Sequence, residues 1–156
     1  MRAVLSTGSN MEDSRAHLAS VEEEFADELV AASSVYRTAP WGGVEQPDFF
    51  NQILVVDVTE SPHELLARCQ QLEQEAHRVR DIRWGPRTLD VDIVALYFDS
   101  GEDITVDTPD LTVPHPRAHE RAFVLVPWLE VDGEARLGGR GVDKLASVLD
   151  AEVTPA

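Results

Sequence analysis

The chain contains only one cysteine, Cys69, and only one lysine, Lys144, among its 156 residues. A lone cysteine cannot form an intrachain disulfide, and its position among apolar residues at helical spacing favours a reducing compartment. No apolar run approaches the roughly 20 residues that a membrane-spanning helix needs, and the apolar segment after Met1-Arg2 is too short for a signal peptide. We therefore expect a cytoplasmic protein with no membrane partner.

Positive charge is also scarce. The chain carries 13 Lys and Arg against 29 Asp and Glu, for a formal net charge of −16. Binding to nucleic acid or to anionic membranes without sequence preference needs a broad cationic surface, so the composition argues against both. A chain of this length suits one domain, which we place at 1–156. We expect a monomer that binds small molecules.

The arginines that are present are concentrated in one place. Four of them, at 78, 80, 83 and 87, lie within ten residues. Asp90 and Asp92 follow, at the start of the apolar run 93–98, which is typical of a strand. Because side chains alternate along a strand, the two carboxylates should share one face, roughly 6.5–7 Å apart. Paired carboxylates can hold Mg²⁺ and guanidinium groups bind phosphate oxygens, so this stretch predicts a metal-assisted polyphosphate site.

The order of the predicted elements favours a ferredoxin-like fold. We expect strands at 2–7, 30–38, 53–58 and 90–98, with a helix after the first strand and another after the third. Asn10 is expected to cap the first helix, and Ser61-Pro62-His63-Glu64 is typical of a capping box that starts the second. This split βαβ order predicts an α+β sandwich: an antiparallel sheet with helices on one face, and the other face free for ligands. The rest of the chain should form C-terminal additions of less regular structure.

Phe49 and Asn51 have the same parity at the start of a predicted strand. An aromatic ring and an amide that project together can recognise a flat heterocycle, although a phenylalanine in a strand is more often part of the core. The long connection at 39–48 contains Trp41 and two adjacent glycines, and its length and composition predict a mobile lid.

His115 lies between Pro114 and Pro116, which hold the backbone extended. A histidine fixed in this way, upstream of Arg121, could contact a phosphate. It could equally be an ordinary loop histidine.

The block from Arg83 to Val94, Arg-Trp-Gly-Pro-Arg-Thr-Leu-Asp-Val-Asp-Ile-Val, closely resembles the 6-hydroxymethyl-7,8-dihydropterin pyrophosphokinase family of the folate pathway. The likeness runs nearly from end to end. Further stretches that carry it are Gly8-Ser9-Asn10, Tyr36-Arg37-Thr38, Gln46-Pro47-Asp48-Phe49 with Asn51, Arg78-Val79-Arg80, and Leu111-Thr112-Val113-Pro114-His115 with Arg121 and Phe123.

The resemblance implies that the terminal two phosphates of ATP are transferred, as one pyrophosphoryl unit, to the hydroxymethyl oxygen of the reduced pterin, and that AMP is released. By that likeness Asp90 and Asp92 hold two Mg²⁺ ions, while Arg78 and Arg87 neutralise charge on the moving group. The residues implied on the ATP side are Gln70, Glu73, Arg80, Trp84 (part of a lid), Ile93, Thr112, His115 and Arg121. The residues implied on the pterin side are Thr38, Trp41, Phe49, Asn51 and Phe123.

At three positions the chain departs from the usual family pattern. Ala39 stands where proline is common, Trp41 where leucine is familiar, and Phe49 where tyrosine is often found. A phenylalanine keeps the stacking surface of a tyrosine, so these differences concern the packing of the lid and the affinity for pterin.

Two other functions remain open at this point. A nucleotide-sugar transferase also uses Asp-x-Asp to chelate metal, but it would leave the Arg-x-Arg and Phe/Asn sets unexplained. A regulatory ligand-binding module is a common use of ferredoxin-like folds. Such a module would need neither paired metal ligands nor the four adjacent arginines.

Overall fold

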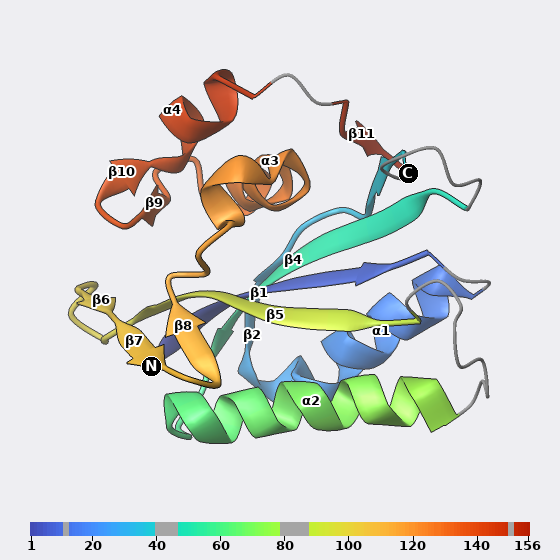
Figure 1. Cartoon of the computed structure of the whole chain (residues 1–156), viewed down its shortest axis with the longest axis horizontal. Coiled ribbons are helices and arrows are strands. Elements are labelled where there is room, and N and C mark those ends of the chain that lie inside the picture. Colours follow the sequence, from blue (N-terminus) through green and yellow to red (C-terminus); the bar gives the residue numbers. More distant parts are fainter. Residues whose placement is uncertain (11–12, 40–46, 79–87, 150–151) are drawn as a thin grey trace.

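The computed structural model describes residues 1–10, 13–39, 47–78, 88–149 and 152–156. Within these residues, an antiparallel sheet of seven strands runs through the middle of the molecule (Figure 1). Its strands follow the order β11-β3-β4-β1-β5-β6, and β2 pairs with the C-terminal half of β4. The bounds are β1 (Arg2–Ser9), β2 (Leu29–Ala32), β3 (Tyr36–Thr38), β4 (Phe49–Asp57), β5 (Asp90–Tyr97), β6 (Asp103–Ile104) and β11 (Thr154–Pro155).

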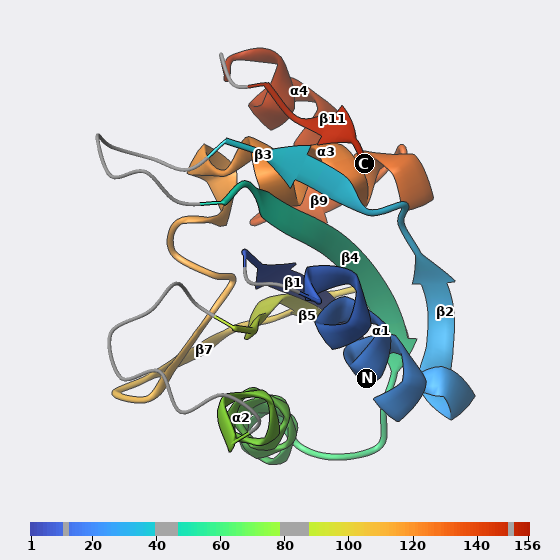
Figure 2. The same ribbon diagram turned by 90° about the vertical axis from the view of Figure 1, so that its right-hand side faces the viewer.

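Two helices, α1 (Ser14–Glu24) and α2 (Pro62–Arg78), cover one face of this sheet, as Figures 1 and 2 show. Their apolar stripes, which include Leu18 and Leu65, are buried against residues of β1, β4 and β5 in one core cluster. The predicted α+β fold, with an antiparallel sheet and helices on one face, is confirmed. Fully buried leucine or valine side chains contribute roughly 1.5–3 kcal/mol each, so this cluster is a main source of stability.

The predicted capping box at the start of α2 is formed. The backbone N–H of Glu64 donates to Ser61 Oγ at 3.2 Å, and the backbone N–H of Ser61 donates to Glu64 Oε1 at 3.0 Å. Both bonds satisfy N–H groups that a helix start leaves without an intrahelical partner.

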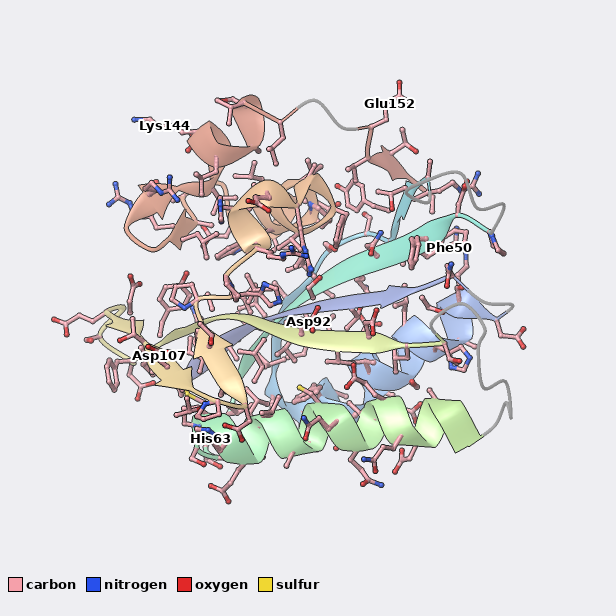
Figure 3. All side chains as sticks on the ribbon, viewed as in Figure 1. Phe50, His63, Asp92, Asp107, Lys144 and Glu152 are labelled. Atoms are coloured by element: carbon pink, nitrogen blue, oxygen red, sulfur yellow. The ribbon has the colours of Figure 1, made fainter. Side chains whose placement is uncertain are left out.

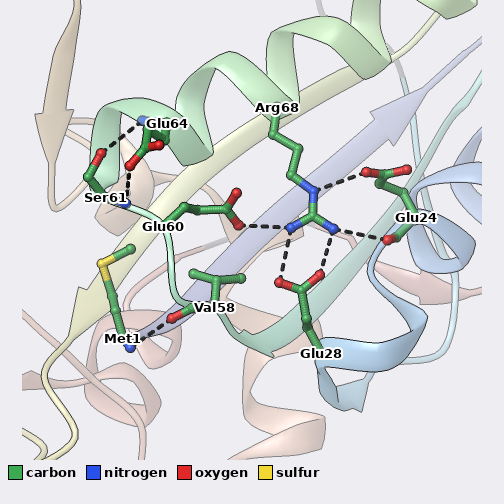
Figure 4. A network of polar contacts seen from close by, with 8 residues as sticks. All are labelled: Met1, Glu24, Glu28, Val58, Glu60, Ser61, Glu64 and Arg68. Atoms are coloured by element: carbon green, nitrogen blue, oxygen red, sulfur yellow. Dashed lines mark hydrogen bonds and ion pairs between the residues drawn. The ribbon is translucent and has the colours of Figure 1, made fainter.

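Arg68 fastens the middle of α2 to the end of α1 and the short 3₁₀ helix after it (Figure 4). Its guanidinium donates to Glu28 at 2.6 and 3.0 Å, to Glu60 at 2.8 Å and to Glu24 at 3.0 Å. The same group lies 4.0 Å from the centre of the Phe25 ring. One cation therefore joins three carboxylates from three segments of the chain.

The opposite face of the sheet is not entirely free. The helices α3 (Ala122–Val131) and α4 (Val142–Ser147) pack over part of it, with the small hairpin of β9 (Arg136–Leu137) and β10 (Arg140–Gly141). Trp128 of α3 is 1% exposed in a second core cluster with Ile53 and Val94. The C-terminal additions are thus more regular than expected, because they must bury the apolar side chains of this face.

Two predicted boundaries were wrong. Asn10 is buried and does not cap α1, which begins at Ser14 after an N-cap at Asp13. The strand predicted at 30–38 is interrupted between β2 and β3, where Ser33 exchanges backbone and side-chain hydrogen bonds with Ile53 of β4. A serine hydroxyl that bonds a neighbouring backbone N–H competes with the regular ladder, which explains the break.

After β6, a hairpin of β7 (Val106–Thr108) and β8 (Leu111–Val113) packs beside β5 and leads to His115. A short 3₁₀ helix at Ala118–Glu120 then connects to α3. Within the described part of the chain, no helix has the length and apolar character needed to cross a membrane.

Candidate active site

Asp90 and Asp92 lie on the same face of β5, and both line one pocket of about 340 Å³. Figure 3 labels Asp92, the third residue of β5, where this strand runs beside β1. The sequence prediction that the two carboxylates project together is confirmed. The pocket is lined by Ser6, Gly8, Thr38, Ala39, Phe49, Asn51, Asp90, Asp92, His115, Arg121 and Phe123.

Eight of these lining residues were predicted, and three were missed: Ser6, Gly8 and Ala39. Ser6 and Gly8 belong to β1, where they pair with Asp92 and Asp90 respectively. Their small size leaves room above the strand for the two carboxylates. Two small residues at the same parity in a central strand were the signal in the sequence, but only the strand register places them opposite the aspartates.

Arg121 supplies positive charge to the carboxylate end of the pocket. Its Nη1 lies 3.6 Å from Asp92 Oδ2, and both side chains are partly exposed. The guanidinium also lies 5.6 Å from the centre of the Phe123 ring. Arg121 directly precedes α3, so this helix carries a cation and an aromatic ring to the pocket side by side.

His115 reaches the pocket because its backbone is bonded to β5. Its N–H donates to Val94 O at 2.9 Å, and its Nδ1 accepts the backbone N–H of Arg117 at 3.1 Å. Burial lowers the pKa of His115; the charge of Asp92 opposes this shift, while Arg121 and Arg117 add to it. The imidazole is therefore mainly neutral at pH 7 and can donate a hydrogen bond without adding full positive charge.

The other end of the pocket combines two aromatic rings with an amide. Asn51 is 4% exposed, and its Nδ2 donates to Thr38 Oγ1 at 3.1 Å. A Cβ atom at Gly8 would lie only 3.0 Å from Asn51 Oδ1. The glycine therefore leaves space for the amide, and the threonine orients it; Phe49 and Phe123 line the same pocket.

Four residues predicted on the ATP side do not line this pocket. Gln70 on α2 and Thr112 on β8 are exposed, while Ile93 is 4% exposed in the core between the sheet and the helices. Glu73 accepts the backbone N–H of Val91 at 3.0 Å. They lie on α2, β5 and β8, which are neighbouring elements, and their contact with a nucleoside stays a prediction.

Several predicted residues lie outside the described part of the chain. Trp41, Arg80, Trp84 and Arg87 fall within the stretches that the structure does not describe. Arg78 is the last residue of α2, and its side chain is likewise outside the description.

The donor set of the carboxylate end fits a hard divalent cation. Among the described residues, no three His, Cys, Asp or Glu side chains come together as a metal site. Mg²⁺ does not require such a group, because it is usually held by one or two carboxylates together with waters and substrate phosphates. Asp90 and Asp92 supply the two carboxylates, and the nearby Arg121 guanidinium shows that cationic groups are accepted beside Asp92.

Known proteins resemble this chain over most of its length. The family model for 7,8-dihydro-6-hydroxymethylpterin-pyrophosphokinase (HPPK) matches residues 4–133. A 2-amino-4-hydroxy-6-hydroxymethyldihydropteridine pyrophosphokinase of Mycobacterium tuberculosis is 48% identical over 160 residues, which cover 99% of this chain and 85% of that protein. The protein of the same name from Pseudomonas aeruginosa is 37% identical over 156 residues, covering 97% of this chain and 93% of the relative.

Solved structures support the fold. A structure described as HPPK-DHPS in complex with substrates has a TM-score of 0.66 and 12% identity, covering 94% of this chain and 42% of the other. Wild-type HPPK-DHPS of Plasmodium falciparum has a TM-score of 0.65 and 12% identity, covering 94% and 40%. The chain spans less than half the length of these structural neighbours, and at this identity the likeness shows the fold alone.

The family match spans most of the chain, and curated relatives of one name cover nearly all of it. Neither a nucleotide-sugar transferase nor a regulatory module accounts for that match. The chain belongs to the 7,8-dihydro-6-hydroxymethylpterin-pyrophosphokinase family, and it is a pyrophosphoryl transferase of folate biosynthesis.

Proposed function

We propose that this chain transfers a pyrophosphoryl group from ATP to the hydroxymethyl oxygen of 6-hydroxymethyl-7,8-dihydropterin with Mg²⁺ held at Asp90 and Asp92. One observation carries the proposal: a single pocket joins these two carboxylates to the set of Phe49, Asn51 and Phe123. One end has the chemistry to hold metal-bound phosphate, and the other has the chemistry to hold a flat heterocycle. The acceptor hydroxyl and the transferred group would meet between them.

Two Mg²⁺ ions, when bound, would neutralise phosphate charge and polarise the acceptor hydroxyl. The chain's own part is mainly positioning and charge neutralisation, because phosphoryl-type transfer needs little covalent chemistry from the protein. Arg121 and His115 would meet phosphate oxygens beside Asp92; the 3.6 Å distance from Arg121 Nη1 to Asp92 Oδ2 and the position of His115 in the same pocket support this. By the family likeness, Arg78 and Arg87 would act on the moving group, with Arg80 on the ATP side.

The pterin ring would lie between Phe49 and Phe123, where both faces of a planar heterocycle can stack. Asn51 would read the amide edge of the ring, since its side chain is already oriented by Thr38. Ser6 and Gly8 form the floor of the same pocket, and Trp41 belongs to this side by the family likeness.

The nucleoside of ATP would lie against α2, β5 and β8, near Gln70, Glu73, Ile93 and Thr112. Trp84 would belong to a lid over both ligands. Water must be excluded while the phosphates react, because ATP would otherwise be hydrolysed.

We propose a monomeric, single-domain, cytoplasmic enzyme. Both core clusters are built on the one sheet, which supports a single domain. Cys69 is fully buried, and burial raises the pKa of its thiol to about 12, so this thiol is poorly placed to form a disulfide with another molecule. Light scattering at micromolar concentration tests the monomer: a mass near 17.3 kDa is expected, and twice that mass would contradict it.

The reaction is tested by incubating the protein with ATP, Mg²⁺ and the reduced hydroxymethylpterin. AMP should appear in step with the pyrophosphorylated pterin, and removal of Mg²⁺ with a chelator should stop the reaction. Formation of ADP, or turnover without pterin, would contradict the proposed reaction.

A further inference from the structure

The strand that carries the two aspartates is unevenly supported. On one side, β5 pairs with β1 along its length, from Asp90 opposite Gly8 to Tyr97 opposite Arg2. On the other side, β6 reaches only Leu96 and Tyr97. Within the described residues, the half of β5 that holds Asp90 and Asp92 therefore has no strand hydrogen-bonded to its outer edge.

A side chain takes the place of that missing strand. Glu73, in the C-terminal half of α2, accepts the backbone N–H of Val91 at 3.0 Å through its Oε2. Val91 is 4% exposed, and it stands between the two aspartates in the chain. A buried N–H needs a partner, and a carboxylate acceptor makes a stronger hydrogen bond than a neutral carbonyl does.

The position of this bond ties it to the aspartates. Side chains on either side of a strand residue take their direction from its backbone, so a bond at Val91 holds the peptide planes that orient both neighbours. Further along the same edge, His115 N–H donates to Val94 O, which holds the next part of the strand. The hydrogen bond from Val91 to Glu73 thus holds the outer edge of β5 at the two aspartates.

We infer that Glu73 is a positioning residue, which sets the spacing and direction of Asp90 and Asp92 through its hydrogen bond to the Val91 backbone. This goes beyond the nucleoside contact that the family likeness implies for Glu73, and it rests on the proposed metal role of the two aspartates. The inference differs from a nucleoside contact in one respect: it acts on the protein before any nucleotide binds.

The test compares variants of the ligand-free protein. Glu73→Leu removes the acceptor, Glu73→Gln keeps an oxygen at the same reach, and Glu73→Asp keeps the charge but shortens the side chain. Glu75→Leu is the matched control, because Glu75 is an exposed carboxylate on the same helix, where it accepts a hydrogen bond from Gln71 Nε2 at 3.1 Å. The first readout is hydrogen exchange of the Val91 amide by NMR, and the second is Mn²⁺ affinity without nucleotide.

Glu73→Leu and Glu73→Asp should speed exchange of the Val91 amide and weaken Mn²⁺ binding about 10- to 100-fold, the range for losing an outer-shell partner of a metal ligand. Glu73→Gln should restore both to within a few-fold, and Glu75→Leu should change neither. If circular dichroism shows that Glu73→Leu is unfolded, the comparison of Glu73→Gln with Glu73→Asp still tests the inference.

The inference is overturned if the Val91 amide and Mn²⁺ affinity are unchanged in Glu73→Asp while only the KM for ATP rises. Rescue by Asp and not by Gln would also overturn it, since charge rather than the bond would then matter. Asp92→Ala separates this from failure of the metal role: if that variant binds Mn²⁺ normally, the proposed metal site is wrong, whatever happens at the Val91 amide.

Discussion

At the scale of single residues, the pterin end of the pocket depends on Gly8, which has no side chain and so leaves space for Asn51. Asn51 is buried and held by the Thr38 hydroxyl, and its Oδ1 would be 3.0 Å from a Cβ at Gly8. That distance is shorter than ordinary carbon–oxygen contacts, so a larger residue at position 8 must displace the amide. The buried amide cannot move without losing a hydrogen bond.

Gly8→Ala should therefore weaken pterin binding about tenfold, which corresponds to roughly 1.4 kcal/mol, the scale of a hydrogen bond lost or misdirected. Calorimetry in the presence of a non-hydrolysable ATP analogue measures this. Gly133→Ala is the control, because a Cβ at that position would have no atom within 4 Å. Equal pterin affinity in the two variants would show that Gly8 does not govern the orientation of Asn51.

At the scale of elements, α2 is held against α1 by one cation. Arg68 is 21% exposed and bonds three carboxylates, and without it Glu24, Glu28 and Glu60 would be left close together. The bonds are charge-assisted but partly solvated, so the net effect is smaller than their number suggests.

Arg68→Leu should lower the free energy of unfolding by about 1–3 kcal/mol, because three like charges lose their shared partner. Urea denaturation at neutral pH measures the change, and Arg140→Leu, at an exposed position in β10, is the control. Equal free energies of unfolding for the two variants would mean that the Arg68 network does not stabilise the fold.

The second element contact joins α3 to β3. Tyr36 donates from its hydroxyl to Glu130 Oε1 at 2.6 Å, while the backbone N–H of Ser34 donates to Oε2 at 2.8 Å. Burial, with the hydrogen bond and charge of Glu130, raises the pKa of Tyr36 from 10 to about 12. Because the folded pKa lies above the unfolded one, this group's contribution to stability is complete below pH 10 and is lost as the pH rises toward 12.

Wild-type protein should therefore lose about 1–2 kcal/mol more stability than Tyr36→Phe between a pH below 10 and a pH near 12. Urea unfolding of both proteins at the two pH values measures this difference. The effect of other titrating groups such as Tyr97 cancels, because both proteins contain them. Parallel loss of stability in the two proteins would contradict the raised pKa of Tyr36.

At the scale of the whole molecule, sequence patterns predicted those features that depend only on residues close together in the chain. The capping box of α2 and the shared face of Asp90 and Asp92 need only neighbouring residues, and both are present. The family likeness placed Ile93 with the nucleoside. Its parity, opposite to that of Asp92, places its side chain in the core.

The rest depended on contacts between distant parts of the chain. Ser6 and Gly8 enter the pocket only through the register of β1 with β5. The packing of α3 on the second sheet face follows from burial of Trp128, which no local pattern reveals. The sequence, read together with the family likeness, therefore predicted the main elements and eight of the eleven residues that line the pocket, including Arg121 and Phe123. The small residues of β1 that line it required the strand register of the folded chain.

The central claim is that the carboxylate pair of β5 holds the metal that binds the polyphosphate. The direct measurement is the AMP-forming turnover of Asp92→Ala at saturating Mg²⁺, with Asp107→Ala, an exposed aspartate of β7, as the control. Loss of one electrostatic contact to the transition state predicts at least about 10²-fold slower turnover for Asp92→Ala, with an unchanged fold. Turnover close to that of the Asp107→Ala control would contradict the account.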